Sequence, residues 1–308
     1  MAEPETMSTS ELKAVIKNAG LKYDDCFEKS DLIARAKDAL ATSVVTEVDA
    51  ESEFVQLVAA AIDQLGGGSA FDGVKRSLAL IAEDPSEMKA ALDGATKAML
   101  AITFNSEDAL IEAGFPASHD SKYHDLIAVL SAPYDWAEAM LREVEIEGLE
   151  EGPEGARLLL GVDVCECLHW RRGALRFMRS SQLHEAGRGA EVNDAEMAAA
   201  VTDLKAMLQC KAAFDVSECD IDGNNDQVGM LLAEGCYSTN HALAMVYIGE
   251  LGFVRLKNDT APTPERENIR ADAEEWLARY VRCCEICLGQ QGWSDAKARA
   301  MLQGLPAP

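Results

Sequence analysis

Apolar residues recur at helical spacing along most of this chain, whereas the alternation of apolar and polar residues that marks a strand never persists. The periodic segments are rich in Ala, Leu, Met, Glu and Lys, which favour helices, and β-branched runs are short. We therefore predict an all-α fold. In the main part of the chain the expected helices are 54–65, 71–82, 87–103, 122–130, 134–146, 156–182, 194–213, 227–234, 238–256, 266–288 and 295–303.

The first part of the chain predicts a small helix-loop-helix unit. Ser8 and Glu11 form a capping box, Gly20 can end the first helix, and Ser30 can cap the second. The apolar residues expected to join the two helices are Leu12, Val15, Ile16, Leu32, Ile33, Ala36 and Leu40. The periodicity then fades and acidic residues accumulate, which indicates a flexible linker. The predicted organisation is a unit at 8–41, an acidic linker at 42–53 and a multi-helix globular domain at 54–305.

The loop of the first unit reads Asp25-Cys26-Phe27-Glu28-Lys29-Ser30-Asp31-Leu32-Ile33, and Glu11-Leu12-Lys13 and Gly20 precede it. With these residues the unit resembles the SAP-like module at the C-terminus of the astrocyte-derived neurotrophic factor family. That family carries Cys-x-x-Cys in the loop, whereas here Tyr23 stands at the first position. SAP modules elsewhere bind DNA. Six basic and six acidic residues lie between Ser8 and Leu40, so we favour protein docking or a structural role.

The charge balance narrows the classes of function. Lys and Arg number 28 against 53 Asp and Glu, a formal net charge of −25 over 308 residues. Coating a nucleic acid requires positive charge along the phosphates, so this composition argues against that function. No apolar stretch approaches the roughly 18–20 residues of a transmembrane helix, and the acidic start lacks the layout of a signal peptide. We expect a cytoplasmic protein that contacts membranes only through partners.

None of the candidate metal or catalytic motifs is complete. Residues 220–226 begin like a calcium loop, but Asn225 stands where the turn needs Gly and Leu231 where Glu should close the shell. Cys165, Cys167 and His169 cannot converge on one ion from a single helix, and Cys283, Cys284 and Cys287 lack a second pair. No P-loop, Gly-x-Ser-x-Gly or His-Glu-x-x-His string occurs. We predict no metal, no cofactor and no enzymatic activity, and we expect the nine cysteines to be reduced thiols.

Two sets of charged residues on the predicted helices are expected to pair with groups of opposite charge. Arg171 lies on an apolar face, and Glu250 and Arg255 are the only charges in the apolar run 242–256. Because an unpaired buried charge is costly, we predict that Arg171 pairs with Glu250, with Asp163 or Glu166 as alternative partners for Arg171. A basic stripe is formed at spacings of three and four by His169, Arg172, Arg176 and Arg179. We favour an acidic face within this chain as its complement, and the alternative is a docking patch for an acidic partner.

Three ordered blocks carry a second resemblance. They are Glu166-Cys167-Leu168-x-Trp170-Arg171-Arg172-Gly173-Ala174-Leu175, then Leu231-Leu232-Ala233-x-Gly235-x-Tyr237-Ser238 with His241-x-Leu243-Ala244-Met245-x-Tyr247-x-Gly249-Glu250, and Tyr280-Val281-x-x-Cys284-Glu285 with Trp293. Over about residues 54–303 the chain resembles the RIMOC family, the Rab-interacting subunit of the Mon/Ccz complex.

The second resemblance implies a non-enzymatic adaptor. Its expected partners are a late-endosomal Rab GTPase and the Mon/Ccz guanine-nucleotide exchange complex of that GTPase. The expected roles are in endolysosomal traffic and mitophagy, with recruitment to endosomal or mitochondrial membranes through those partners. The alternative is a SAP-module nuclear or nucleic-acid-associated protein, which would use the first unit and the basic stripe.

Overall fold

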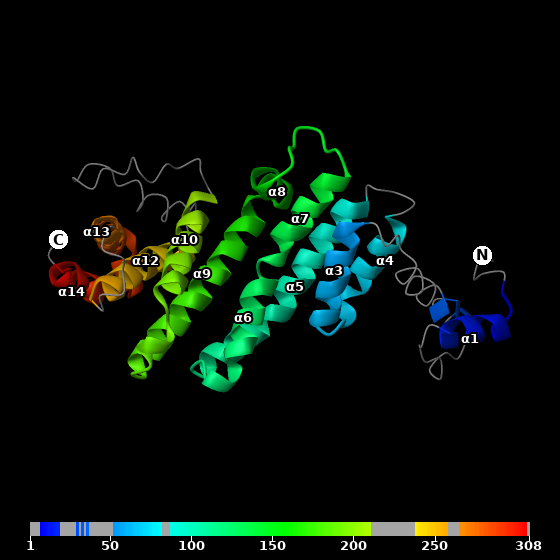
Figure 1. The fold of residues 1–308 in the computed structure, drawn as a ribbon, viewed down its shortest axis with the longest axis horizontal. Helices are drawn as coiled ribbons and strands as arrows, with labels where there is room; N and C mark the ends of the chain where they lie inside the picture. Colours follow the sequence, from blue (N-terminus) through cyan, green and yellow to red (C-terminus); the bar gives the residue numbers. More distant parts are fainter. Residues whose placement is uncertain are drawn as a thin grey trace. The chain divides into compact units, whose positions relative to one another are not determined.

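The structure is a computed structural model that describes residues 7–18, 29–30, 32–33, 35–36, 52–81, 87–210, 238–257 and 265–306. Within these ranges the regular structure is helical and no strand occurs, so the prediction of an all-α fold is confirmed (Figure 1). No helix in these ranges combines the length and the apolar composition needed to cross a bilayer. The expected helix at 227–234, the run 220–226 and most of the predicted linker at 42–53 lie outside the described residues.

The α-helices are α1 (Thr9–Asn18), α3 (Glu53–Gln64), α4 (Asp72–Leu80), α5 (Glu87–Glu112), α6 (Asp120–Val129), α7 (Ala132–Glu143), α8 (Pro153–Leu160), α9 (Val162–Glu185), α10 (Asp194–Cys210), α12 (Thr239–Lys257), α13 (Arg266–Cys283) and α14 (Ala296–Gly304). Short 3-10 turns are η2 (Ser69–Phe71), η3 (Ala117–His119), η4 (Gly189–Glu191) and η8 (Gly289–Gln291), and η7 (Cys284–Leu288) is a π-helical turn.

The chain divides into two compact units. Unit 1 holds Met1–Phe104 and Ser131–Leu160, and unit 2 holds Asn105–Leu130 and Gly161–Pro308. Helix α5 therefore contributes its first part to unit 1 and its last turns to unit 2. The domain boundaries derived from the sequence, with a module at 8–41 and a single domain at 54–305, stay predictions.

A small apolar cluster joins α1 to the helical residues 32–33 and 35–36. Leu12 and Ile16 of α1 pack with Leu32 and Ala36, and all four side chains are buried. The stripes expected from the sequence of the first unit thus meet at these four positions. The SAP-like character of this unit stays a prediction, because most of its loop lies outside the described residues.

In unit 1 a carboxylate at the end of α7 accepts hydrogen bonds from the start of α3. Glu143 accepts a hydrogen bond from the backbone N–H of Phe54 at 3.0 Å and another from the Ser52 hydroxyl at 2.7 Å. The Ser52 oxygen in turn accepts from the Val55 N–H at 3.2 Å, which caps the helix. The carboxylate at the N-terminus of α3 also suits the positive end of the helix dipole.

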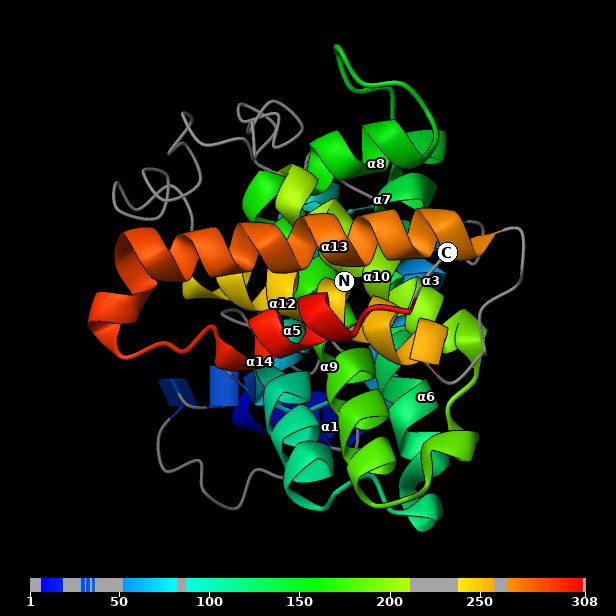
Figure 2. The ribbon, with the colours of Figure 1, turned by 90° about the vertical axis from the view of Figure 1, so that its left-hand side faces the viewer.

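Unit 2 is built in successive helix layers. Helix α9 packs along α10, α12 lies against this pair, and α13 packs along α12 (Figure 2). Two glycines allow neighbouring helices of this unit to approach each other closely. A Cβ at Gly173 of α9 would lie 2.7 Å from Cγ of Leu204 in α10, and a Cβ at Gly252 of α12 would lie 2.8 Å from Cβ of Ala273 in α13. The helices can pack at these distances only because the two positions have no side chain.

The two largest differences from the predicted helices lie at Gly161 and at the end of α5. The expected helix 156–182 is divided at Gly161, whose φ of 83° lies in the left-handed region that glycine tolerates, so α8 ends there and α9 begins. The helix expected to end at residue 103 continues to Glu112 as α5. Its last turns carry Glu107, whose carboxylate pairs with α9, so a tertiary contact stabilises polar residues that indicate a helix end in the sequence.

Replacing Gly173 with Ala should lower the free energy of unfolding by about 1–3 kcal/mol, because the added methyl group would force Leu204 to move. Gly73 in α4 is the matched control, since a Cβ there meets nothing within 4 Å. Gly73→Ala should raise the free energy of unfolding by about 0.5–1 kcal/mol, because alanine reduces the conformational entropy of the unfolded chain. Urea unfolding of both variants measures the difference. Equal effects of the two changes would contradict the close packing of α9 on α10.

Candidate functional site

The basic stripe of α9 meets a single carboxylate of α10. Asp203 Oδ1 lies 3.0 Å from Nδ1 of His169, and it accepts hydrogen bonds from Nε and Nη2 of Arg172 at 3.1 and 2.6 Å. Arg176 donates to the other oxygen, Oδ2. Helical geometry places His169, Arg172 and Arg176 on one face of α9, which lies directly over α10. One buried acid thus holds three basic side chains.

The pKa of Asp203 reflects this arrangement. Burial acts to raise it, but the hydrogen bond from His169 and the charges of Arg172 and Arg176 outweigh burial and hold the pKa below its ordinary value. Asp203 is therefore ionised in the native protein at neutral pH. A carboxylate held by three basic groups is not available as a general acid or base.

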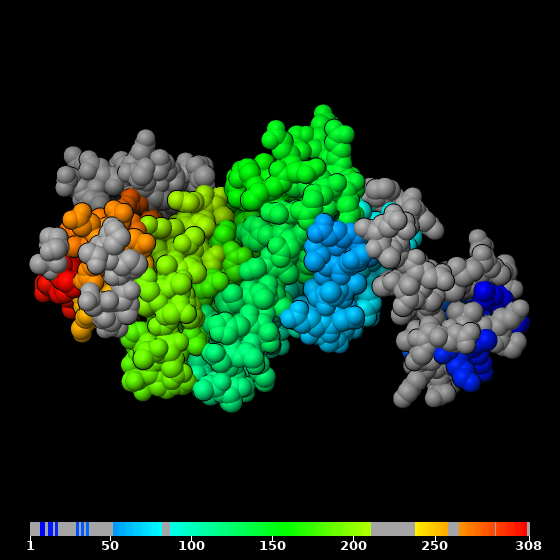
Figure 3. Space-filling model, in the orientation of Figure 1, coloured from blue at the N-terminus to red at the C-terminus, as the bar shows by residue number. Residues whose placement is uncertain are grey.

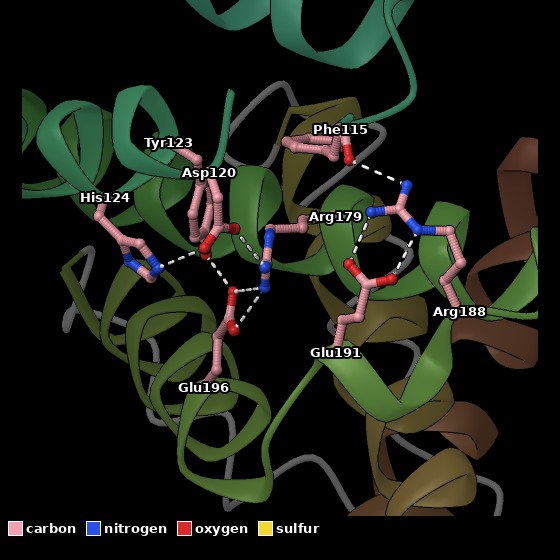
Figure 4. A network of polar contacts seen from close by, with 8 residues as sticks. All are labelled: Phe115, Asp120, Tyr123, His124, Arg179, Arg188, Glu191 and Glu196. Carbon is pink, nitrogen blue, oxygen red and sulfur yellow. Dashed lines mark hydrogen bonds and ion pairs between the residues drawn. The ribbon is translucent and has the colours of Figure 1, made fainter. Parts of the chain in front are cut away.

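The fourth member of the stripe, Arg179, joins α9 to both α10 and α6 (Figure 4). Its guanidinium donates to Glu196 of α10 at 2.7 and 2.9 Å and to Asp120 of α6 at 2.7 Å. It also lies over the ring of Tyr123, 4.7 Å from the centroid, and the Tyr123 hydroxyl donates to Glu196. Burial and the neighbouring carboxylate of Glu196 raise the pKa of Tyr123 well above its ordinary value, so this hydroxyl stays protonated.

A second arginine secures the connection between α9 and α10. Arg188 pairs with Glu191 at 2.6 and 2.7 Å, and it donates to the backbone carbonyl of Phe115 at 3.2 Å (Figure 4). In the space-filling view the surface of α6 and η3 adjoins the surface of this connection (Figure 3). Arg188 therefore ties this connection to the backbone at Phe115, and Arg179 ties α9 to α6 and α10.

The structure gives Arg171 and Glu250 different partners from the predicted ones. Arg171 pairs with Glu107 at the end of α5, through Nε at 3.1 Å and through Nη2. Glu250 accepts from Nζ of Lys297 in α14 at 2.6 Å. The predicted Arg171–Glu250 pair is therefore wrong, because Glu250 lies beside Phe177 and the last turns of α9, away from Arg171. Arg255, the other charge of the apolar run 242–256, pairs with Asp194 through two bonds of 2.7 Å.

The structure shows that the basic stripe pairs with carboxylates of this chain, the first of the two interpretations of the stripe. Arg172 is 8% exposed and Arg179 5%, and each is matched by carboxylates of unit 2. A guanidinium that is buried and already paired presents no surface to an acidic partner. The docking interpretation of His169, Arg172, Arg176 and Arg179 is therefore not supported.

The acids that complete these pairs were not singled out from the sequence, although one of them carries a signal. Asp203 lies among Ala200, Leu204 and Met207 on one face of α10, and all four are buried. A lone acid at helical spacing within an apolar stripe indicates a buried partner, as the lone Arg171 did on α9. Glu107 carries no such signal, because the polar residues around it suggest a helix end.

The described residues offer little reactive chemistry. Burial raises the pKa of the Cys167 thiol, against the effect of the positive charge of Arg171, so this thiol is not an activated nucleophile. Among these residues, no disulfide involves Cys165, Cys167, Cys210, Cys283 or Cys284. No group of three His, Cys, Asp or Glu side chains in the described ranges is arranged to hold a metal ion. The charged network instead fixes α6, α9, α10 and the end of α5 relative to one another.

Comparison with known proteins gives one family. The model of the family described as RAB7A-interacting MON1-CCZ1 complex subunit 1 matches residues 73–275, which span α4 to α13 up to its middle. The protein of that description from Danio rerio is 29% identical over 230 residues, covering 71% of this chain and 79% of the relative. Those from Mus musculus and Homo sapiens are each 27% identical over 230 residues, covering 67% of this chain and 74% of the relative. No solved structure gives a significant match.

Proposed function

This chain belongs to the family of RAB7A-interacting MON1-CCZ1 complex subunit 1, and we propose that it is a non-enzymatic adaptor that binds a RAB7A-type GTPase and a MON1-CCZ1-type complex. The observation that carries the proposal is the match over residues 73–275, which includes helices of both compact units. The family resemblance of the three sequence blocks supports the same assignment.

The described structure is consistent with binding through a surface. The buried side chains of Arg172 and Arg179 pair with carboxylates of the same chain. Burial raises the pKa of the Cys167 thiol, which makes this thiol less reactive. The network therefore supplies a rigid framework of helices. Binding surfaces on a rigid framework lose little conformational entropy when a partner docks.

The proposed cellular role is in endolysosomal traffic and mitophagy. In this proposal the protein is cytoplasmic and reaches endosomal or mitochondrial membranes through its GTPase and exchange-complex partners. The nucleic-acid alternative has lost one of its two supports, because the basic stripe is buried and paired. The SAP-like unit is the remaining sequence feature that favours the nucleic-acid alternative.

Affinity capture tests this function. The tagged full chain is expressed in cells, and lysates are supplied with GDP or with a non-hydrolysable GTP analogue before capture. The exchange complex and the RAB7A-type GTPase should be enriched together, and a Rab GTPase of another compartment serves as the control. Absence of both partners under both nucleotide conditions would contradict the proposal.

A further inference from the structure

A partly open cavity of about 90 Å³ lies between α9 and α12 in unit 2. Its apolar lining comes from Phe177 of α9 and from Leu251 and Val254 of α12. Aromatic rings extend this lining along the seam between the helices. The ring of Tyr247 is stacked on Phe177 with centroids 3.7 Å apart, and the ring of Trp170 is stacked on Tyr247 at 6.0 Å.

Two of the three aromatic rings at this seam are only half-buried. Trp170 and Tyr247 are of intermediate exposure, whereas Phe177 is buried. Large aromatic residues that remain partly exposed next to a cavity are typical of the centres of protein interfaces. We refer to the cavity and these two rings as the α9/α12 groove.

The rim of the α9/α12 groove is acidic. Glu185 at the end of α9 and Glu250 of α12 both line the cavity, together with Ser181 and His184. Among the residues that the structure describes, no Lys or Arg lines the cavity. The rim therefore offers carboxylate and hydroxyl oxygens, which favour a cationic group.

One of the two rim carboxylates, Glu250, already pairs with a basic side chain of this protein. Nζ of Lys297 lies 2.6 Å from Oε1 of Glu250, although 65% of the Lys297 side chain is exposed. The Glu250 side chain is only 15% exposed. A partner cation that docks there would replace Lys297, so the carboxylate would keep a basic partner.

We propose that the α9/α12 groove docks a lysine or arginine side chain from an amphipathic segment of a protein partner. The aliphatic stem of that side chain lies on Phe177 and Val254, and its charge faces Glu185 and Glu250. Long basic side chains commonly divide in this way between an apolar surface and a charged tip. The net charge of −25 also favours encounter with a basic surface. The identity of the partner as the exchange complex or its GTPase rests on the proposed function.

Charge reversal at the rim tests the groove. Purified full-length chain is titrated against purified MON1-CCZ1 complex together with the RAB7A-type GTPase, and affinity is measured by interferometry. Glu185→Lys should weaken binding at least tenfold, because it places a cation where the partner cation docks. Glu185 is exposed, so thermal unfolding of the variant should match that of the unchanged chain. The matched control is Glu274→Lys, an exposed position on α13 outside the groove, which should change affinity less than twofold.

The two proposals fail differently in this experiment. If the unchanged chain binds and Glu185→Lys binds equally well, the groove is not the docking site, while the adaptor function stands. If the unchanged chain binds neither partner, the adaptor function is overturned, and the groove proposal falls with it.

A photocrosslinking amino acid at Ser181 gives a positive test of the same surface. Crosslinked peptides of the partner should include a Lys or Arg within a helical segment. Crosslinks that map only to segments without a basic residue would overturn the assignment of the occupant.

Discussion

Replacing Asp203 with Asn should lower the free energy of unfolding by about 3–5 kcal/mol. The change removes the negative charge that His169, Arg172 and Arg176 share, and Arg172 is buried. Buried charges whose partner is removed carry a penalty of this size. In thermal unfolding we expect a loss of roughly 10 °C at neutral pH.

Asp125→Asn is the control for this change. Asp125 lies in α6 of the same unit and is exposed, so its replacement should alter stability by less than about 0.5 kcal/mol. A loss below about 1 kcal/mol for Asp203→Asn would show that the network does not support the fold.

The effect of Asp203→Asn should also depend on pH. The pKa of Asp203 is below its ordinary value in the native state, so the ionised carboxylate stabilises the fold at neutral pH. That contribution is lost as the pH falls through the native-state pKa. The difference in stability between the unchanged chain and the variant should therefore narrow in acid.

Replacing Glu107 alone with Leu should destabilise the protein by about 3–5 kcal/mol, because Arg171 would lose the carboxylate that holds it in the core. Replacing both residues, as Glu107→Leu with Arg171→Met, should restore most of this loss. Burial raises the pKa of Glu107 in spite of the hydrogen bond and charge of Arg171, so desolvation of the carboxylate outweighs the attraction of the pair. An apolar pair of similar volume avoids that desolvation.

A double-mutant cycle followed by urea unfolding measures this pair. The account predicts a double variant within about 1 kcal/mol of the unchanged chain and a strongly favourable coupling between the two replacements. Additive losses in the double variant would mean that the two side chains contribute independently, and the pair would then not explain the continuation of α5 to Glu112.

Local patterns were sufficient to predict the helices but not the partners of the buried charges. The apolar spacing that predicts 238–256 and 194–213 gives α12 and α10 within a few residues, because the apolar stripe of each helix is buried in the structure. The break at Gly161 was missed, since the residues on both sides continue a helical pattern and only the positive φ ends the helix. A single glycine inside such a pattern does not reveal its φ.

The charged network shows a similar limit. The basic stripe, His169, Arg172, Arg176 and Arg179, lies on one face of α9, as its spacing predicts. The spacing does not reveal which helix packs against that face. That identity depends on the packing of α10 against α9 through Gly173 and Leu204, which brings Asp203 beneath the stripe. The prediction that Glu250 pairs with Arg171 is wrong for a related reason. Helices α9 and α12 do pack together, but Glu250 lies beside the last turns of α9 and not beside Arg171.

If this chain is a binding subunit, it should associate with purified partners, and measuring that association is the most direct test of its function. The full chain, the MON1-CCZ1 complex and the RAB7A-type GTPase are mixed in pairs and all together, and their masses are measured by light scattering after size-exclusion chromatography. The account predicts a stable complex of the chain with the exchange complex, the GTPase or both. Separate elution of the chain in every mixture, with the exchange complex itself intact and active on the GTPase, would contradict the claim.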